Sequence, residues 1–157
     1  MAIATSVREY LDRKRVKYDV LPHPLTHDSA HSAELAHVPG DQLAKAVILE
    51  DDNGYLMVVL PASHKLDLEA LGNELHRDGL TFADEHELLT LFEDCERGAV
   101  PPFGSPYDIE TVLDRSLADA AEVYFEAGDH LTLIRLKGSD FRRLMQDVPQ
   151  RSISHHL

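Results

Sequence analysis

Residues 43–61 read LAKAVILEDDNGYLMVVLP, and this stretch decides the fold. Two apolar runs, at residues 43–50 and 55–61, are separated by Asp51-Asp52-Asn53-Gly54, which is a strong signal for a β-hairpin. The second run does not alternate between apolar and polar residues, so we expect a central strand that is covered on both faces. The sequence therefore predicts a sheet built around this hairpin.

Helices and further strands are predicted on both sides of the hairpin. Apolar residues at helical spacing and end signals predict helices at residues 5–16, 32–37, 68–75, 85–92 and 139–147. Short strands are predicted at residues 18–21, 81–82 and 109–113, and a second hairpin at residues 122–127 and 130–136. This mixture favours an α+β (irregular α/β) fold with a mixed, largely antiparallel central sheet flanked by helices.

The length and composition are those of one ordinary globular domain. We expect a single domain over residues 1–157, with a flexible tail at residues 150–157 that includes His155 and His156. The single cysteine excludes an internal disulfide, and no apolar run approaches the ~20 residues that span a bilayer. The first residues lack the pattern of a signal peptide. These features predict a cytoplasmic protein with no membrane partner.

The formal net charge of -13 argues against a large nucleic-acid interface. Basic residues are dense at Arg13-Lys14-Arg15 with Lys17, and weaker groups lie at Arg135 and Lys137 and at Arg142-Arg143. Two interpretations remain open at this point, a solvated helix face and a small phosphate interface.

Residues 98–104 read GAVPPFG, a loop in which two glycines bracket two prolines. Proline restricts the backbone and lacks an N–H, whereas glycine permits close approach of a ligand. The N–H groups of Gly98, Ala99 and Val100 have no guaranteed strand partner and can point at a carbonyl or phosphate. Such donors are what the oxyanion site of acyl transfer requires, so this is a candidate active-site loop.

Lys45 is the one charged residue among the alternate positions Leu43, Lys45, Val47 and Leu49, which share a face of the first strand. The lysine either extends its ammonium group to the edge of the sheet or lies at the mouth of a pocket. In the second case it would hold a phosphate or carboxylate as a point charge.

Cys95 is a weak candidate for a nucleophile. Asp94 and Glu96 flank it, and carboxylates disfavour the reactive thiolate, so we expect a small buried side chain. The sequence also lacks a Gly-x-Ser-x-Gly elbow, a P-loop and a dinucleotide-binding fingerprint. These absences argue against a serine hydrolase, an NTPase and a dehydrogenase.

The histidines give little sign of a metal site. His23, His27 and His31 recur every four residues, but Pro22 and Pro24 disfavour one helix through all three. His27 and His31 remain as half of a possible site, and we expect no bound metal. His130, after Gly128-Asp129, belongs either to a simple tight turn or to the space around the Gly/Pro loop, if the two hairpins are neighbours.

Taken together, these segments resemble the YbaK/EbsC family, which includes the editing domain of bacterial prolyl-tRNA synthetases. The similarity covers residues 32–145. Residues 43–49 resemble the family's lysine strand, Gly98 and Pro102 its G-x-x-x-P loop, and residues 124–130 the late strand and turn of the prolyl-editing branch.

The resemblance implies a free-standing deacylase that hydrolyses the ester between a wrong amino acid and the 3′ end of a tRNA, with no protein nucleophile, cofactor or metal. Lys45 would engage the terminal phosphate or adenosine, and the loop would position the ester and water. The expected catalytic residues are Lys45, Gly98, Ala99, Val100, Pro101 and Pro102, and substrate contacts are expected from Lys45, Phe103, Gly104, Gly128 and His130.

The sequence departs from the family pattern at three places that bear on amino-acid specificity. Ala46 stands where threonine is common, residues 94–97 replace a Thr-Gly pair, and Pro101-Pro102 replaces serine then proline. The expected substrate is a small amino acid such as alanine or cysteine on tRNA-Pro or a related tRNA. The partner is the acceptor end of aminoacyl-tRNA, delivered by a synthetase or an elongation factor.

Two other functions remain open from the sequence. One is a catalytically silent module of the same fold that binds a nucleotide or aminoacyl ligand. The other is an interaction protein whose acidic surface docks a partner in translation.

Overall fold

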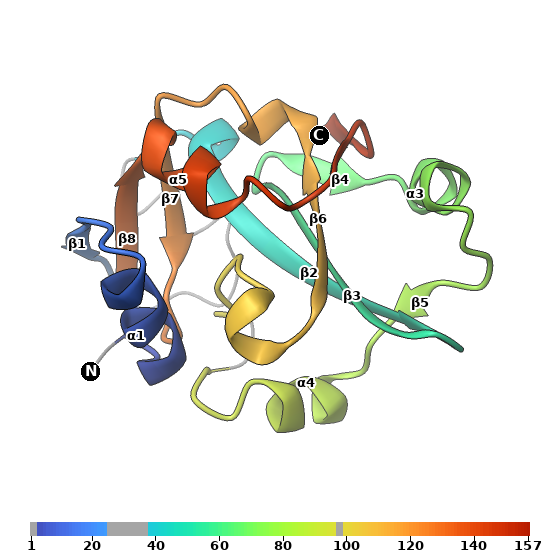
Figure 1. Cartoon of the computed structure of the whole chain (residues 1–157), viewed down its shortest axis with the longest axis horizontal. Coiled ribbons are helices and arrows are strands. Elements are labelled where there is room, and N and C mark those ends of the chain that lie inside the picture. The colour runs from blue at the N-terminus through green and yellow to red at the C-terminus, as the bar shows by residue number, and fades with distance from the viewer. Residues whose placement is uncertain (1–2, 25–37, 97–98) are drawn as a thin grey trace.

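The computed structural model describes residues 3–24, 38–96 and 99–157, which form one large sheet, a small second sheet and flanking helices (Figure 1). The helices are α1 (Thr5–Arg13), α3 (Leu68–Leu75), α4 (Glu85–Leu91) and α5 (Gly138–Leu144), with 3-10 turns η1 (Gly40–Gln42), η2 (Ser105–Tyr107) and η3 (Arg115–Leu117). The strands are β1 (Asp19–Pro22), β2 (Leu43–Asp51), β3 (Gly54–Pro61), β4 (His64–Leu66), β5 (Thr81–Phe82), β6 (Glu110–Asp114), β7 (Glu122–Glu126), β8 (Thr132–Lys137), β9 (Gln150–Arg151) and β10 (Ser154–His156).

The predicted hairpin is confirmed and forms the centre of the large sheet. Strands β2 and β3 pair antiparallel from Ala44 opposite Pro61 to Asp51 opposite Gly54, and this register puts Lys45 opposite Leu60. At the turn, the Asn53 N–H donates to Oδ1 of Asp51 over 2.8 Å, which fixes the reversal of the chain. Most of β3 is buried, as expected for a strand that is covered on both faces.

The strand order of the large sheet is β1-β8-β7-β2-β3-β6-β9, and the short β5 pairs with the end of β2. Pairing within the hairpins and of β1 with β8 is antiparallel, whereas β2 with β7, β3 with β6 and β6 with β9 are parallel. The predicted α+β class with a mixed, largely antiparallel sheet is therefore confirmed. The pairing of β2 with β7 also makes the two hairpins neighbours.

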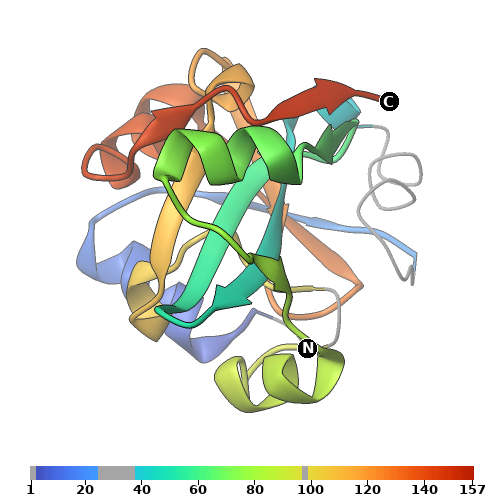
Figure 2. The ribbon, with the colours of Figure 1, turned by 90° about the vertical axis from the view of Figure 1, so that its right-hand side faces the viewer.

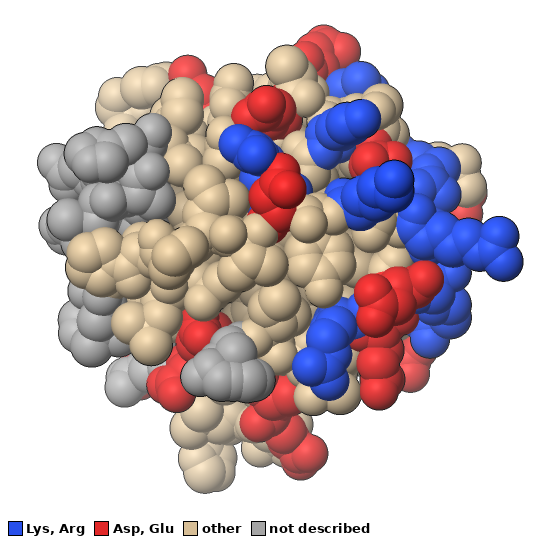
Figure 3. Space-filling model, turned by 90° about the vertical axis from the view of Figure 1, so that its left-hand side faces the viewer, with Lys and Arg blue, Asp and Glu red and all other residues tan. Residues whose placement is uncertain are grey.

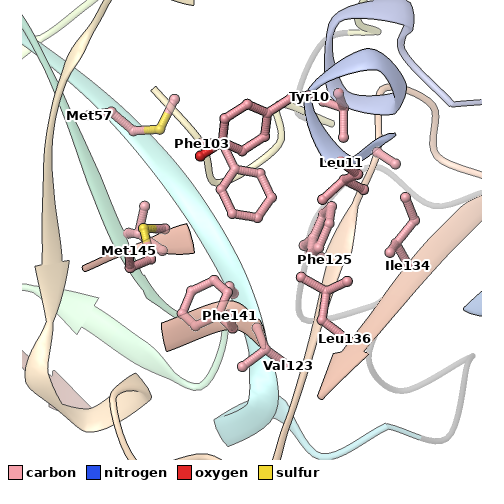
Figure 4. Packing of buried hydrophobic residues seen from close by; sticks show 14 of the residues in the cluster. Tyr10, Leu11, Met57, Phe103, Val123, Phe125, Ile134, Leu136, Phe141 and Met145 are labelled. Carbon is pink, nitrogen blue, oxygen red and sulfur yellow. The ribbon is translucent and has the colours of Figure 1, made fainter. Parts of the chain in front are cut away.

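Helices cover the sheet on both faces. On one face, α1 and α5 pack on β7 and β8 through a large cluster that includes Tyr10, Phe103, Phe125 and Phe141 (Figure 4). On the other face, α3 lies across the strands in Figure 2, and Leu71 packs on apolar residues of β2, β3 and β6. Burial of apolar side chains on both faces is the main stabilising contribution to the fold.

Local end signals explain where the helices begin. The carboxylate of Asp67 accepts the Ala70 N–H over 3.0 Å at the start of α3, as the sequence predicts. At the start of α4, Asp84 and Glu87 form a reciprocal capping box. α1 buries Val7, Tyr10 and Leu11, and it ends before the exposed Lys14.

The expectation of a flexible tail at residues 150–157 is corrected by the structure. β9 pairs with β6, and β10 pairs with β4 so that His156 lies opposite His64. Between these two strands, Ile153 is fully buried beneath α3. Burial of this side chain stabilises the docking of the two short strands.

Several other boundaries differ by a few residues or lie outside the described part of the chain. The last helix ends at Leu144 rather than at residue 147, and β8 begins at Thr132 rather than at His130. The helix predicted at residues 32–37 lies outside the described residues.

Candidate functional site

A pocket of about 220 Å³ lies at the point where the sheet divides beside β2. β2 pairs with β7 through Leu43 and Ala44, and with β5 through Leu49 and Glu50. The stretch between these pairings, residues 44–48, forms one wall of the pocket, and the other walls come from Leu88, Val100 and Glu126. The division of the sheet therefore places part of β2, the Gly/Pro loop and the end of β7 around one cavity.

Lys45 lies on the wall of this pocket and is half-buried. Its Nζ donates to the backbone carbonyl of His64 in β4 over 2.8 Å. The structure thus brings the lysine and Val100 of the loop to the same cavity, the arrangement that the functional interpretation of Lys45 requires.

The first described residues of the Gly/Pro loop are braced by the turn between β7 and β8. The Gly128 N–H donates to the carbonyl of Ala99 over 3.0 Å, and the Glu96 N–H donates to the carbonyl of Gly128 over 2.6 Å. The Ala99 N–H donates to the carbonyl of Glu96 over 3.1 Å, so this group is not the free donor that the sequence suggested. Gly98 lies outside the described residues.

The remaining loop residues serve as an anchor instead of a pocket wall. Pro101, Pro102, Phe103 and Gly104 are all buried. The Phe103 ring packs against Tyr10 and Phe125, with ring centroids 5.5 and 5.1 Å away (Figure 4). Phe103 was expected to contact the substrate, but its ring lies in the core, where burial of a large aromatic side chain is most stabilising.

Gly104 and the turn residues also have structural positions. A Cβ atom at Gly104 would lie 2.0 Å from Oγ1 of Thr111, so the site has no room for a side chain. Gly128 contacts the loop through its backbone and lines a neighbouring hollow with Cys95. His130 is buried and does not belong to the described residues that line the 220 Å³ pocket.

Glu126 is a pocket residue that the sequence analysis missed. It is 4% exposed, and its Oε1 lies 3.2 Å from Nε2 of the buried His23. Strand alternation puts Glu122, Tyr124 and Glu126 on the same face of β7. The sequence signal that could have identified Glu126 is the position of a carboxylate at the end of an apolar strand. Acidic side chains are rarely buried without a function or a partner, so a carboxylate in such a position is a candidate site residue.

Cys95 is not arranged as a nucleophile. Its Sγ lies 3.4 Å from both Oδ1 of Asp94 and the hydroxyl of Tyr107. Burial, with Asp94 as a smaller contribution, raises the pKa of the Cys95 thiol to about 12. The thiol is therefore protonated at neutral pH, in agreement with the expected non-catalytic role.

We expect Cys95 to resist alkylation and to be dispensable for activity. Because its pKa is raised, the thiolate fraction at pH 8 is small, and alkylation by iodoacetamide should be at least about 100-fold slower than in the denatured chain. The rate should rise with pH throughout the range in which the protein stays folded. Cys95→Ala should keep its catalytic rate within about two-fold of the wild type. Fast alkylation of the native protein, or loss of activity in a stable Cys95→Ala variant, would contradict this assignment.

The described residues hold no group of three or more histidine, cysteine or acidic side chains that could bind a metal ion. His27 and His31, the possible half-site, lie outside those residues. No helix within the described ranges is long and apolar enough to cross a membrane.

Solved structures with the same fold show low sequence identity to this chain. The hypothetical protein APE2540 superposes with a TM-score of 0.83 at 22% identity, with 96% of this chain and 99% of that chain covered. A candidate trans-editing enzyme for prolyl tRNA synthetase superposes with a TM-score of 0.81 at 20% identity, with 97% and 96% covered. A candidate signal transduction protein from Marinobacter aquaeolei VT8 superposes with a TM-score of 0.78 at 21% identity over 98% of this chain and 31% of that longer chain.

At these identities the superpositions establish the fold alone. A search of curated protein sequences found no match. The sequence model of the aminoacyl-tRNA editing domain matches residues 23–144, which include β2, the Gly/Pro loop and both hairpins. The chain therefore belongs to the aminoacyl-tRNA editing domain family.

Proposed function

We propose that the protein is a trans-editing deacylase, which hydrolyses the ester of a tRNA that carries a wrong, small amino acid. Alanine or cysteine on tRNA-Pro or a related tRNA is the proposed substrate. Membership of the editing family supports the type of reaction. The observation that carries the proposal is the 220 Å³ pocket, which is smaller than the ~300 Å³ from which pockets for drug-sized ligands begin.

The charges on the pocket walls match those of an aminoacyl ester. The substrate has a positive α-ammonium group on its amino acid and a negative phosphate on its terminal nucleotides. Glu126 supplies a carboxylate for the ammonium group, and Lys45 supplies a cation for the phosphate. Between them the walls formed by Ala46, Ile48 and Val100 are apolar, which suits a small uncharged side chain.

In the proposed reaction a water molecule attacks the ester carbonyl carbon. The bond between this carbon and the ribose 3′ oxygen then breaks, and the proton that the water loses ends on that oxygen. Negative charge develops on the carbonyl oxygen in the transition state, so fixed N–H donors in the loop would stabilise it. We assign this role to Val100, because it lines the pocket and the Ala99 N–H already donates to the carbonyl of Glu96.

The buried Pro101 and Pro102 give the loop its rigidity in this mechanism. Proline has a fixed φ, and burial of both rings holds the preceding Val100 at the pocket wall. Gly128 adds two backbone hydrogen bonds to the same segment. Because the loop is fixed before the substrate arrives, no free energy is needed to order its N–H donors during the reaction.

A panel of mischarged tRNAs tests this proposal. We expect the wild-type protein to release the amino acid from alanyl- or cysteinyl-tRNA(Pro) at least about 10-fold faster than from correctly charged prolyl-tRNA(Pro), because extra volume is excluded by the small pocket. Release of labelled amino acid over time is the measurement. No release above buffer from a broad panel, by a protein with native circular dichroism, would overturn the proposal. Ligand binding without turnover would then identify a silent binding module.

A further inference from the structure

Basic residues from three distant parts of the sequence gather on one face of the molecule (Figure 3). We call this surface the basic face and define it by five of the 15 lysine and arginine residues, namely Lys14, Lys17, Arg135, Lys137 and Arg143. The sequence alone left these groups as separate clusters, either solvated or part of a small phosphate interface. Their convergence is therefore a result of the fold.

Strand pairing and one hydrogen bond bring the three groups together. β1 pairs with β8 so that Asp19 lies opposite Arg135, which places the chain before β1, with Lys17, beside the end of β8, with Lys137. α5 follows β8 directly and carries Arg143. Nη1 of Arg143 donates to the backbone carbonyl of Lys14 over 3.1 Å, which ties α5 to the end of α1.

The basic face is hollowed instead of flat. A depression of about 400 Å³ is lined in part by Lys17, Arg135 and Lys137. A second depression of about 260 Å³ is lined in part by Lys14 and Arg143. Lys14, Lys17 and Lys137 are exposed, so their ammonium groups can meet a ligand that enters either depression.

Three of the acidic residues on this face are engaged by neighbouring groups, and a fourth, Asp147, lines the smaller depression. Oδ2 of Asp19 lies 2.6 Å from Nη2 of Arg135, and Oδ1 of Asp140 lies 3.4 Å from Nη2 of Arg143. The carboxylate of Glu122 accepts the hydroxyl of Tyr124 over 2.7 Å. Five cations against four carboxylates leave this face slightly positive, which is a local reversal of sign in a chain with a formal net charge of -13. Such a reversal favours an anionic partner.

One strand connects the basic face to the pocket. Glu122 of β7 lines the larger depression, and Glu126 of the same strand lines the 220 Å³ pocket. They are four positions apart, which corresponds to roughly 13 Å along a strand. Phosphates follow each other by about 3.4 Å of rise along one strand of a nucleic-acid duplex, so a few nucleotides span this separation.

We propose that the basic face binds the phosphodiester backbone of the tRNA acceptor arm while the aminoacyl end occupies the pocket. This inference rests on the proposed function for the position of the aminoacyl end. Lysines act as point charges for phosphate oxygens, and arginines supply paired N–H donors. An RNA backbone is favoured over an acidic peptide because the family acts on aminoacyl-tRNA.

The test compares two double variants with the same change of charge. Lys17→Glu/Lys137→Glu alters the basic face, and Lys65→Glu/Arg115→Glu alters exposed residues elsewhere. Affinity for uncharged tRNA is measured by fluorescence anisotropy at several salt concentrations. Deacylation is measured on aminoacyl-tRNA and on a 3′-aminoacyl adenosine monophosphate, a single nucleotide that is too short to span the roughly 13 Å to the basic face.

We expect the basic-face variant to bind tRNA about 10-fold more weakly than the wild type. The slope of log affinity against log salt concentration should become shallower by about two, because two phosphate contacts are lost. Its deacylation of the short substrate should stay within about two-fold of the wild type. The control variant should lose less than about a third as much tRNA affinity as the basic-face variant loses.

Three results would overturn the inference. They are equal losses in both double variants, unchanged tRNA binding in the basic-face variant, and an equal loss on tRNA and the short substrate. Displacement of tRNA by polyglutamate at equal charge concentration would assign the face to an acidic peptide instead. If the wild type hydrolyses no substrate, the proposed function fails, but the anisotropy measurements still decide whether this face binds RNA.

Discussion

Lys45→Ala is expected to lower kcat/KM for deacylation by about 100-fold, which corresponds to about 2.7 kcal/mol of transition-state stabilisation. The side chain is half-buried on the pocket wall, where an ion pair is less screened than at the surface. Its Nζ is also held by the His64 carbonyl, so the charge is fixed before the substrate binds. Steady-state deacylation of the preferred mischarged tRNA measures the effect.

Lys65→Ala is the matched control for this variant. Lys65 lies in β4 next to His64, but its side chain is exposed, so activity should stay within about two-fold of the wild type. Thermal unfolding of both variants separates a loss of chemistry from a loss of fold. Full activity in a well-folded Lys45→Ala variant would remove the lysine from the proposed mechanism and leave the pocket without its cation.

Gly128→Ala is expected to give the second large effect, on stability and activity together. Gly128 has φ +113°, which L-residues rarely adopt, and an added Cβ would lie 2.7 Å from Cβ and 2.9 Å from N of Ala4. The strained backbone costs roughly 1–3 kcal/mol, and overpacking adds roughly another 1–3 kcal/mol. Because Gly128 braces Glu96 and Ala99, a shift of this turn should also displace Val100 and slow deacylation.

Gly54→Ala separates the cost of backbone strain from the cost of overpacking. Gly54 has a similar φ of +119°, but an added Cβ meets nothing within 4 Å, so only the backbone strain remains. Denaturant unfolding should therefore show a smaller loss of unfolding free energy for Gly54→Ala, and deacylation should be unchanged. Equal destabilisation of the two variants would show that contact with Ala4 does not constrain Gly128.

The elements of the fold were predictable because their signals are local. The turn at Asp51–Gly54 and the cap at Asp67 depend on hydrogen bonds between residues two or three positions apart. The parallel pairing of β2 with β7 joins Leu43 to Tyr124, and no local pattern encodes that choice. The docking of residues 150–157 was missed for the same reason, because it depends on pairing with the distant strands β4 and β6 and on burial of Ile153.

The candidate site was predictable in part, for reasons that differ between residues. Lys45 stands out because a charge interrupts an apolar strand face, and the structure places it on a pocket wall. Glu126 gives the same kind of signal near the end of β7, but its burial depends on His23, about a hundred positions away. The Ala99 N–H was expected to be free because sequence does not reveal that the chain turns back to the Glu96 carbonyl. Phe103 was expected at the substrate because loop residues are commonly exposed, whereas this loop passes through the core.

The pairing of β10 with β4 has a consequence for the order in which the protein is assembled during translation. The carbonyl that holds Lys45 belongs to His64, and His64 pairs with His156. Until residues 154–156 have emerged from the ribosome, β4 lacks its partner strand and the support of the lysine is incomplete. The nascent chain can therefore form its central hairpin early, but it completes the surroundings of Lys45 only after β10 has been synthesised, about ninety residues after β4.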